Sequence, residues 1–342
     1  MKTYTDFAVE KTCALLSIPS PTGFTDDAIR FLSAEFSALG FASRIMVKGG
    51  LLVDLCGAGE EGLLLEAHCD TLGGMVCEIK PNGRLQLTPI GGMNANNAEA
   101  ENAVVVTRDD RKYEGTLQLI NASFHVNTEY NDKKRVWDAM ELVLDEDVSS
   151  AEDVKKLGIS TGDYVCFDPR TRVTDSGYIK SRFLDDKLSV GILLGLAKYI
   201  RDEHIVPKKH LWAHVTVYEE VGHGGAASVP EGVTEAISVD MGCVGEGLAC
   251  TERMVSVCAK DSRGPYNRDI VIALAAAAEK AGAAYAIDIY PHYGSDVEAT
   301  LNAGWDLRHG LIGAGVYASH GYERSHVDGV EAALKLLAAY IV

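Results

Sequence analysis

The sequence predicts an α/β domain that is interrupted by a small all-β insert. Its 342 residues are enough for one large domain or for a host domain carrying an insert. Helical apolar spacing alternates with apolar strand runs near both ends of the chain, whereas the middle holds short strands bounded by turn residues. We therefore expect a split α/β domain, residues 1–72 and 176–342, and a β-rich insert, residues 73–175.

The elements follow from the spacing of the apolar residues. In the flanks, helices are predicted over residues 4–18, 26–39, 188–202, 269–281 and 329–341. Strands are predicted there over residues 51–56, 63–68, 211–218, 236–240, 255–259 and 284–289. In the insert, strands are predicted over residues 84–88, 103–107, 117–121 and 164–167. A short helix over residues 151–157 has Ser150 as its expected N-cap and Gly158 as its stop.

The segment between the first two strands, residues 57–62, formally matches the GxGxxG pattern of dinucleotide-binding proteins. It leads into another strand instead of a helix, and Glu60 and Glu61 would repel a pyrophosphate. We therefore predict that this segment is a hairpin turn and binds no nucleotide.

Composition narrows the class of protein. The 49 acidic side chains outnumber the 32 basic ones, and the net charge of -17 repels nucleic acids and anionic lipid surfaces. No apolar run approaches the ~18 residues of a membrane helix, and Asp6 and Glu10 stand where a signal peptide would be apolar. These features predict a cytoplasmic protein that binds neither nucleic acid nor membrane.

The eight cysteines form no CxxC pair and lie mostly in apolar segments. This usage predicts reduced, structural thiols rather than disulfides or a Cys-type zinc site. Cys69 lies between His68 and Asp70, and we expect it to be structural as well.

Polar residues gather where the predicted strands end. His68 and Asp70 close the strand of residues 63–68, and their spacing directs both side chains to the same side of an extended chain. A metal-bound imidazole commonly donates its second N–H to a carboxylate, which this spacing offers. Taken alone, the pair also fits a structural role, in which His68 is a hydrogen-bonded histidine beside a loop aspartate.

Two pairs of adjacent carboxylates occupy similar positions. Asp185 and Asp186 precede a helix, where a cap and macrodipole role explains one of them. Glu219 and Glu220 follow a buried strand, where carboxylates are costly unless they are paired or bound to metal. A solvated pair in a loop is the alternative for the two glutamates.

The next strand ends in Asp240, and His320 lies in a glycine-bearing loop before the last helix. Together the clusters supply two histidines and several carboxylates, an N/O ligand set that suits zinc, cobalt or manganese and fits a two-metal hydrolytic site. The sequence has no GxSxG elbow and no P-loop. Adjacent Glu219 and Glu220 also cannot flank a cleft as the paired carboxylates of glycosidases do.

These motifs resemble those of the cocatalytic metallo-aminopeptidases of the tetrahedral, or glutamyl and deblocking, type, some of whose members are labelled endoglucanases. The similarity covers nearly the whole chain. Six short motifs carry it in the correct order: Glu66–Asp70, Leu184–Lys187, Glu219–Gly222, Val239–Asp240, Tyr293–Asp296 and His320–His326. The resemblance implies a mixed-sheet dinuclear metallopeptidase (phosphorylase/hydrolase-like) domain, interrupted after the first motif by a β-rich domain for dimerisation and substrate entry.

The resemblance also implies a ligand set, carried over by position. Asp185 would bridge two divalent ions, with zinc expected and cobalt or manganese as alternatives. His68 and Asp240 would complete one site, and Glu220 and His320 the other.

Further roles are implied around these ligands. Asp70 would orient His68, and Glu219 would be the general base. Asp186 is expected to be a structural neighbour of the bridging residue. His320 is preferred to His326 as a ligand because the Gly-Tyr-Glu context follows it directly.

The sequence departs from the family pattern at three positions. Thr71 stands where the family usually has glutamate, Lys187 replaces the usual arginine, and His223 occupies a position that is normally not histidine. These changes leave the implied ligand set intact and bear on the specificity pocket.

Motifs and resemblance together predict a hydrolase that removes N-terminal residues from peptides. A hydroxide held between the metals would attack the scissile carbonyl, while Glu219 takes the water's proton and delivers it to the leaving amine. Two alternatives stay open: a metal-dependent amidohydrolase or deacylase of small N-acyl compounds, and a metal-binding scaffold without turnover. The implied partners are peptides and further copies of the chain, with a dimer as building block and a dodecamer as the larger assembly.

Overall fold

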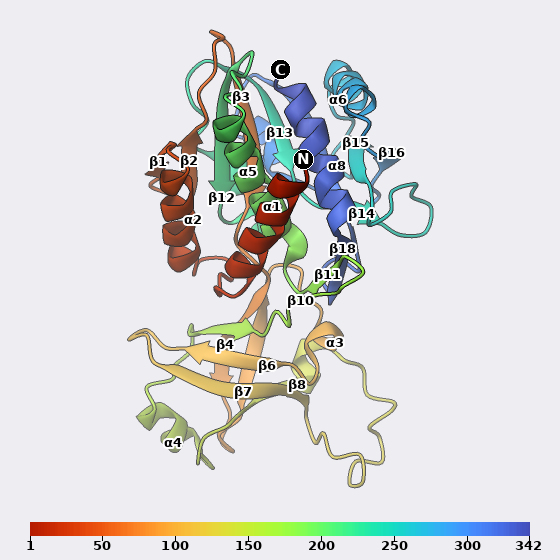
Figure 1. Cartoon of the computed structure of the whole chain (residues 1–342). Helices are drawn as coiled ribbons and strands as arrows, with labels where there is room; N and C mark the ends of the chain where they lie inside the picture. The colour runs from red at the N-terminus through yellow and green to blue at the C-terminus, as the bar shows by residue number, and fades with distance from the viewer. The chain divides into compact units, whose positions relative to one another are not determined.

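The computed structural model describes all 342 residues, which form two compact units. The first contains residues 1–70 and 170–342, and the second contains residues 71–169. Figure 1 shows helices and a mixed sheet in the first unit and mainly β-strands in the second. This confirms the predicted fold class, a mixed α/β domain with a separate all-β insert.

A twelve-stranded mixed sheet forms the centre of the first unit. Its strands are β1 (Ala42–Ile45), β2 (Leu51–Asp54), β3 (Gly62–His68), β10 (Arg172–Val173), β11 (Tyr178–Ser181), β12 (His210–Thr216), β13 (Val233–Val239), β14 (Gly242–Val244), β15 (Val255–Lys260), β16 (Tyr285–Ile289), β17 (Arg308–Tyr317) and β18 (Glu323–His326). The main order is β1-β2-β12-β3-β13-β17-β18-β11-β10, with β14 and β15 also paired to β17, and β16 to β15. Strands β12, β3, β13 and β17 run parallel to their neighbours in this series, so their carboxyl ends meet at one edge.

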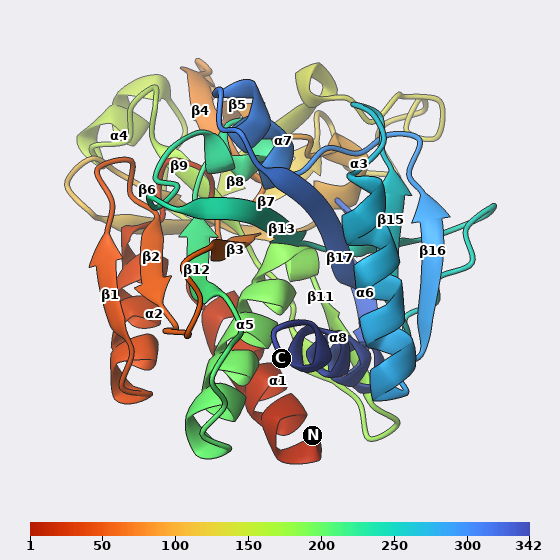
Figure 2. The same cartoon turned by 90° about the horizontal axis from the view of Figure 1, so that it is seen from above.

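Six α-helices cover this sheet: α1 (Lys2–Leu16), α2 (Asp26–Ala38), α5 (Leu184–Asp202), α6 (Arg268–Ala281), α7 (Asp296–Asn302) and α8 (Val327–Tyr340). Figure 2 shows α1, α5 and α8 on one side of the sheet and α7 on the other. Helix α5 packs against α1, α8 and β3, and its apolar residues such as Leu188, Ile192 and Leu196 are buried. The packing of this buried helix fixes the position of its N-terminal residues near the edge of the sheet where the parallel strands end.

The second unit is a closed antiparallel barrel with a core of its own. Its strands are β4 (Gly73–Ile79), β5 (Leu85–Ile90), β6 (Asn102–Val106), β7 (Lys112–Leu119), β8 (Met140–Leu144) and β9 (Tyr164–Phe167), in the order β4-β5-β8-β7-β6-β9. Inward side chains such as Val76, Leu85, Leu117, Leu142 and Val165 are fully buried or nearly so. The unit also contains the short helices α3 (Ala95–Ala98), η1 (Trp137–Ala139) and α4 (Ala151–Lys156).

The predicted cap of helix α4 is confirmed. The Ser150 side chain accepts a hydrogen bond from the main-chain N–H of Asp153, and the Ser150 hydroxyl also donates to the Asp153 carboxylate at 2.7 Å. Gly158 follows the helix with a φ of 87°, a left-handed conformation that favours glycine.

The predicted hairpin between β2 and β3 is wrong, because β12 lies between these two strands and pairs with both. The glycines of the connection serve a different purpose. A Cβ atom on Gly57 would lie 2.0 Å from the Lys209 carbonyl oxygen, and one on Gly59 would lie 2.4 Å from that of Lys208. Glycine is therefore required here by the close approach of the segment that enters β12, not by a tight turn.

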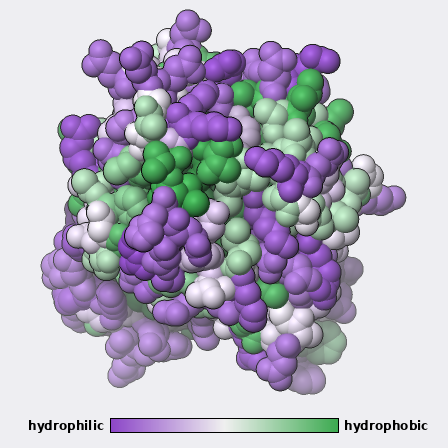
Figure 3. All heavy atoms as spheres, turned by 45° about the horizontal axis from the view of Figure 1, so that its top comes forward, coloured by the Kyte–Doolittle hydropathy of each residue, from purple (hydrophilic) through white to green (hydrophobic).

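No helix of the chain is long and apolar enough to cross a membrane. The face drawn in Figure 3 is mainly hydrophilic, and its hydrophobic side chains gather in small clusters.

Candidate metal centre

Parallel pairing brings the ends of three central strands together. His68, the last residue of β3, is in register with Thr216, the last residue of β12. Asp240 directly follows β13, which pairs with the other side of β3. After β12 the chain turns through the short 3-10 helix η2 (Glu219–Val221), which carries two carboxylates to the same edge. Open α/β sheets hold their ligands at such carboxyl ends.

Three buried side chains, His68, Asp185 and Asp240, form a compact group of potential metal ligands. One ligand atom from each lies within 4.8 Å of the others. The distance from His68 Nε2 to Asp185 Oδ1 is 3.2 Å. On the other side of the ring, His68 Nδ1 lies 2.9 Å from the main-chain oxygen of Asp70 and 3.5 Å from its carboxylate. A proton on Nδ1 leaves Nε2 with a free lone pair, which is the form of histidine that binds metals.

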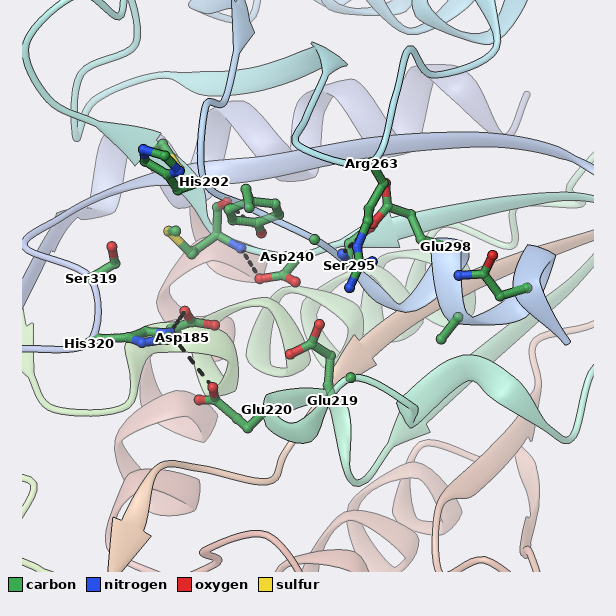
Figure 4. A pocket seen from close by; sticks show the side chains of 17 residues that line it. Asp185, Glu219, Glu220, Asp240, Arg263, His292, Ser295, Glu298, Ser319 and His320 are labelled. Atoms are coloured by element: carbon green, nitrogen blue, oxygen red, sulfur yellow. Dashed lines mark hydrogen bonds and ion pairs between the residues drawn. The ribbon is translucent and has the colours of Figure 1, made fainter. Parts of the chain in front are cut away.

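The second oxygen of Asp185 faces a different pair of residues. His320 Nε2 lies 3.6 Å from Asp185 Oδ2 and 3.6 Å from Glu220 Oε2. The Glu220 side chain is only 4% exposed, and its Oε1 has no hydrogen-bond partner. Figure 4 shows Asp185, Glu220 and His320 converging on one another. Asp185 therefore stands between two groups of potential ligands, one on each of its oxygens.

Glu219 lies beside the first group, with its Oε2 3.6 Å from His68 Nε2. Its position depends on Asp70, whose carboxylate accepts the main-chain N–H groups of Glu219 at 3.2 Å and Glu220 at 3.4 Å. The hydroxyl of Thr22 donates to the same carboxylate at 2.7 Å. Asp70 thus contacts both the imidazole of His68 and the backbone that carries the two glutamates.

The electrostatics of the cluster favour a bound cation. Burial raises the pKa values of the Glu219 and Glu220 carboxyls well above their usual range. Burial and the charge of Asp185 raise the pKa of Asp240 to about 7. Burial lowers the pKa of His68, but hydrogen bonds to Asp185 and Asp70 outweigh it and raise that pKa well above the usual value. Several carboxyl groups are buried close together, so their simultaneous ionisation is costly, and bound divalent ions would offset this cost.

Glu323 is a buried member of the site whose role sequence reasoning missed. Its carboxylate accepts the main-chain N–H of Asp185 at 3.0 Å and that of His320 at 3.0 Å. It therefore ties the start of α5 to the loop between β17 and β18. In the sequence, Glu323 was considered only as part of the segment that follows His320. Its role could not be predicted, because hydrogen bonds to distant main-chain groups leave no local sequence pattern.

Two neighbours of Asp185 have structural contacts. Asp186 accepts the main-chain N–H of His68 at 3.2 Å, while its Oδ1 is buried without a partner. Lys187 is buried and donates to the main-chain oxygens of Leu15 at 3.1 Å and Ile18 at 2.6 Å, which ties α5 to the end of α1.

His223, His326 and Thr71 make contacts with residues outside the ligand groups. The imidazole of His223 stacks on Tyr218, with ring centroids 5.1 Å apart. His326 caps helix α8, because its Nδ1 accepts the main-chain N–H of Asp328 at 3.0 Å. The structure therefore brings His320, and not His326, to Asp185. Thr71 is buried and donates to the main-chain oxygen of Leu72 at 3.0 Å.

A pocket of about 450 Å³ opens onto this cluster. Its lining residues are Asp185, Glu219, Glu220, Gly222, Asp240, Met241, Cys243, Arg263, His292, Tyr293, Gly294, Ser295, Glu298, Ala299, Asn302, Ser319 and His320. The ligand groups thus have direct access to a cavity large enough for an amino-acid side chain and the adjacent peptide bond.

Known proteins resemble this chain in both sequence and structure. The M42 glutamyl aminopeptidase family matches residues 49–336. The protein named "Putative aminopeptidase YhfE" of Bacillus subtilis (strain 168) is 42% identical over 328 residues, which are 96% of this chain and 95% of that protein. Aminopeptidase APDkam598 from the archaeon Desulfurococcus kamchatkensis has the same fold, with a TM-score of 0.87 at 21% identity over 99% of this chain and 95% of that one. The TET1 peptidase of Pyrococcus horikoshii gives a TM-score of 0.85 at 24% identity, covering 98% and 99% of the two chains.

The fold, the cluster at the strand ends and these similarities define a metallo-aminopeptidase, an enzyme that hydrolyses peptide bonds. The chain belongs to the M42 glutamyl aminopeptidase family, which confirms the family indicated by its six sequence motifs.

Proposed function

We propose that this chain uses two divalent ions, which five of its side chains hold, to remove N-terminal residues from peptides. His68 and Asp240 would bind one ion, Glu220 and His320 the other, and Asp185 both. The observation that supports this most directly is the position of Asp185, whose Oδ1 lies 3.2 Å from His68 Nε2 and whose Oδ2 lies 3.6 Å from His320 Nε2. A carboxylate whose two oxygens face separate groups of ligands can bind one metal ion with each oxygen and so bridge the two ions.

The residues present fit such ions. Glu220 Oε1 is a buried oxygen without a hydrogen-bond partner, and a carboxylate oxygen in that state is costly unless a cation neutralises it. Two imidazoles and three carboxylates form an N/O ligand set that suits zinc first, with cobalt and manganese as alternatives.

Glu219 has the chemistry of the general base. When bound, the two ions would polarise the scissile carbonyl and lower the pKa of a water molecule. Glu219 lies beside this position but is not part of either ligand group, so its carboxylate is free to accept the proton of the attacking water. The same carboxyl would then deliver that proton to the leaving amine.

Family membership favours an aminopeptidase over a deacylase of small N-acyl compounds, because the matching family and the relative that is 42% identical are both described as aminopeptidases. A scaffold without turnover would have no use for a carboxylate placed like that of Glu219.

A substrate panel separates these functions. Unblocked aminoacyl 4-nitroanilides and N-acetylated amino acids would be offered to the metal-free protein and to protein supplied with zinc, cobalt or manganese. We expect metal-dependent hydrolysis of the unblocked compounds. Hydrolysis of the acetylated compounds alone would identify a deacylase, and metal binding without hydrolysis of either would identify a scaffold.

We further propose that the chain assembles into a homo-oligomer built from dimers, and that the barrel, residues 71–169, contributes to assembly and to the substrate entrance. The support is similarity of fold: the Pyrococcus horikoshii TET1 peptidase is described as assembling into a tetrahedron or a large octahedral shell. A dodecamer is the size we expect for the larger assembly.

A further inference from the structure

The two glutamates of the candidate site belong to one short segment, the glutamate turn, residues 218–226, whose backbone is strained at its entry (Figure 4). Tyr218, directly before the 3-10 helix η2, has a φ of 71° and a ψ of 22°. This left-handed conformation is rare for a bulky side chain. Gly222, directly after η2, is also left-handed, with a φ of 86°. The conformation of Tyr218 therefore persists only because surrounding contacts hold it.

Two buried carboxylates hold N–H groups of the glutamate turn. The Asp70 carboxylate accepts the main-chain N–H of Glu219 at 3.2 Å. The Asp296 carboxylate, at the start of α7, accepts the main-chain N–H of Gly225 at 2.6 Å. The turn also folds back on itself, because a Cβ atom on Gly224 would lie 3.0 Å from both the Cα and the N atom of Glu219. A displacement of Gly224 is therefore transmitted directly to the backbone that carries the Glu219 side chain.

Carbonyl groups of the same turn receive a donor from a different element, the loop between β1 and β2. Lys48 Nζ donates to the main-chain oxygens of His223 and Gly224, and the second of these bonds is 2.9 Å long. The ammonium group also lies 5.9 Å from the centre of the Tyr218 ring, within the range of a cation–π interaction. Lys48 thus contacts both the residue with the strained backbone and the segment that packs against Glu219.

The hairpin that carries Lys48 fixes its position. Strand β2 pairs with β12, the strand that leads into the glutamate turn, and Leu51 is in register with Val215. The main-chain N–H of Met46 donates to the main-chain oxygen of Gly50 at 2.7 Å, which closes the hairpin. Lys48 therefore reaches the turn from a loop that is anchored to the same sheet.

The charge of Lys48 suits this position. The buried carboxylates of Asp296, Asp70 and Glu66 favour its ammonium form, although partial burial lowers the pKa of Lys48. Lys48 forms no ion pair with a carboxylate, so its hydrogen bonds go to the main-chain oxygens of the turn. Hydrogen bonds from a charged donor are stronger than those between neutral groups. No neutral side chain at position 48 could replace them fully.

We propose that Lys48 is a positioning residue for Glu219, because its ammonium group holds the glutamate turn in the strained conformation that directs the Glu219 carboxylate into the pocket. The inference rests on the proposed aminopeptidase function, in which Glu219 is the general base. Lys48 does not line the pocket, so it acts through Tyr218 and Gly224 and not on the substrate. Without this hold, Glu219 would be present but less often at the position from which it accepts a proton.

The test compares Lys48→Met, which keeps the length of the side chain and removes its donors, with Lys48→Arg, which keeps a cation with donors. Arg44→Met removes an exposed cation from β1 of the same hairpin and is the matched control. Leucyl 4-nitroanilide would be offered to zinc-saturated proteins of equal measured metal content. Lys48→Met should lower kcat about tenfold to a hundredfold, the usual scale for hydrogen bonds to a charged group, with KM little changed. Lys48→Arg should keep most of kcat, and Arg44→Met all of it.

Hydrogen exchange of the metal-free proteins gives a second readout that needs no activity. In Lys48→Met, peptides that cover the glutamate turn should exchange about tenfold faster than in the parent, because the turn opens locally more often. Peptides from the barrel and from α5 should keep the parent rates. Lys48→Arg and Arg44→Met should keep the parent rates in the glutamate turn as well.

Parent values of kcat in Lys48→Met at equal metal content would overturn the proposal. Faster exchange over the whole chain would also overturn it, because Lys48 would then stabilise the fold in general. An equal loss of kcat in Lys48→Arg would assign the effect to the packing of the lysine side chain and contradict a role for its hydrogen bonds. If the parent hydrolyses no substrate, the aminopeptidase function fails separately, and the exchange rates of the glutamate turn then decide whether Lys48 holds it.

Discussion

The carboxylate of Asp70 accepts the main-chain N–H of Glu219 at 3.2 Å. The same carboxylate lies 3.5 Å from the imidazole of His68, so one buried group connects a proposed metal ligand with the proposed general base. In the sequence, Asp70 and Glu219 are separated by the whole barrel and by α5, and the parallel pairing of β3 with β12 brings them together.

Replacing Asp70 should therefore weaken metal binding without removing a ligand. Asparagine keeps the size of Asp70, but its NH2 group would face a group that donates a hydrogen bond to the Asp70 carboxylate in the parent protein. Groups that orient a metal-bound histidine typically contribute 10-fold to 100-fold in affinity, and we expect a loss on this scale for Asp70→Asn in calorimetric titration with zinc. Asp132→Asn, on the exposed surface of the second unit, is the control. Equal affinities of all three proteins would show that Asp70 does not orient the site.

Asp185→Ala should weaken the binding of both ions. About two divalent ions per chain are expected in the saturated parent protein, measured by elemental analysis and calorimetry. Because each oxygen of Asp185 faces a different ligand group, its removal should affect both binding steps, whereas Glu220→Ala should affect one. An Asp185→Ala protein that keeps one ion at full affinity would exclude the bridge.

Glu219→Gln should separate metal binding from turnover. The variant keeps the size of the side chain and removes its ability to accept a proton. Metal content should persist, while kcat falls by a factor on the order of a hundred to ten thousand, the usual scale for a general base. Full activity in the variant would place the base elsewhere.

Burial and the contact with Asp261 raise the pKa of the Glu298 carboxyl, which predicts a specific dependence of stability on pH. Its pKa is about 8 in the folded chain, against an ordinary value of 4.5. Between these values the folded protein binds more protons at this position than the unfolded chain does, so this residue's contribution to stability falls as pH rises from about 4.5 to about 8. Glu298→Gln removes this effect and keeps a donor toward Asp261. The difference in Tm, variant minus parent, should be larger at pH 8 than at pH 5.5, and an equal difference at both values would contradict a protonated Glu298.

Most elements of the first unit could be predicted because their apolar periodicity is strong, but its central strand β17 could not. This strand contains Gly310, Gly313 and Gly315, which locally indicate a loop. The structure supplies the reason for them: a Cβ atom on Gly313 would lie 1.6 Å from the carbonyl oxygen of Asp240, and one on Gly315 would lie 2.1 Å from that of Thr251. The sheet brings two other segments so close to β17 that only glycine fits, and this crowding cannot be deduced from a local pattern.

The same contrast holds for the candidate site. Short motifs at strand ends located the side chains that converge around Asp185, because each motif combines a buried strand with an unexpected polar residue. Glu323 was not assigned a role of its own. It acts through main-chain groups of two distant segments, and these contacts exist only once the chain is folded.

The barrel offers the last prediction, which concerns assembly. It buries its own core, with Leu85, Leu117 and Leu142 fully inaccessible, and it contains none of the proposed metal ligands. The first unit likewise has its own sheet and helices, so neither unit needs the other for its core. Replacing residues 73–167 with a short Gly/Ser linker, which leaves Asp70 in place, should give a chain that folds and binds metal.

The excised chain is expected to form a smaller oligomer than the parent when both are measured by light scattering at equal concentration, because the contacts contributed by the barrel are lost. Metal titration of the same samples distinguishes a lost interface from a damaged fold, since a chain that binds two ions has kept the edge formed by β3, β12 and β13. A folded, metal-binding chain that retains the parent assembly would place the subunit contacts in the α/β unit instead.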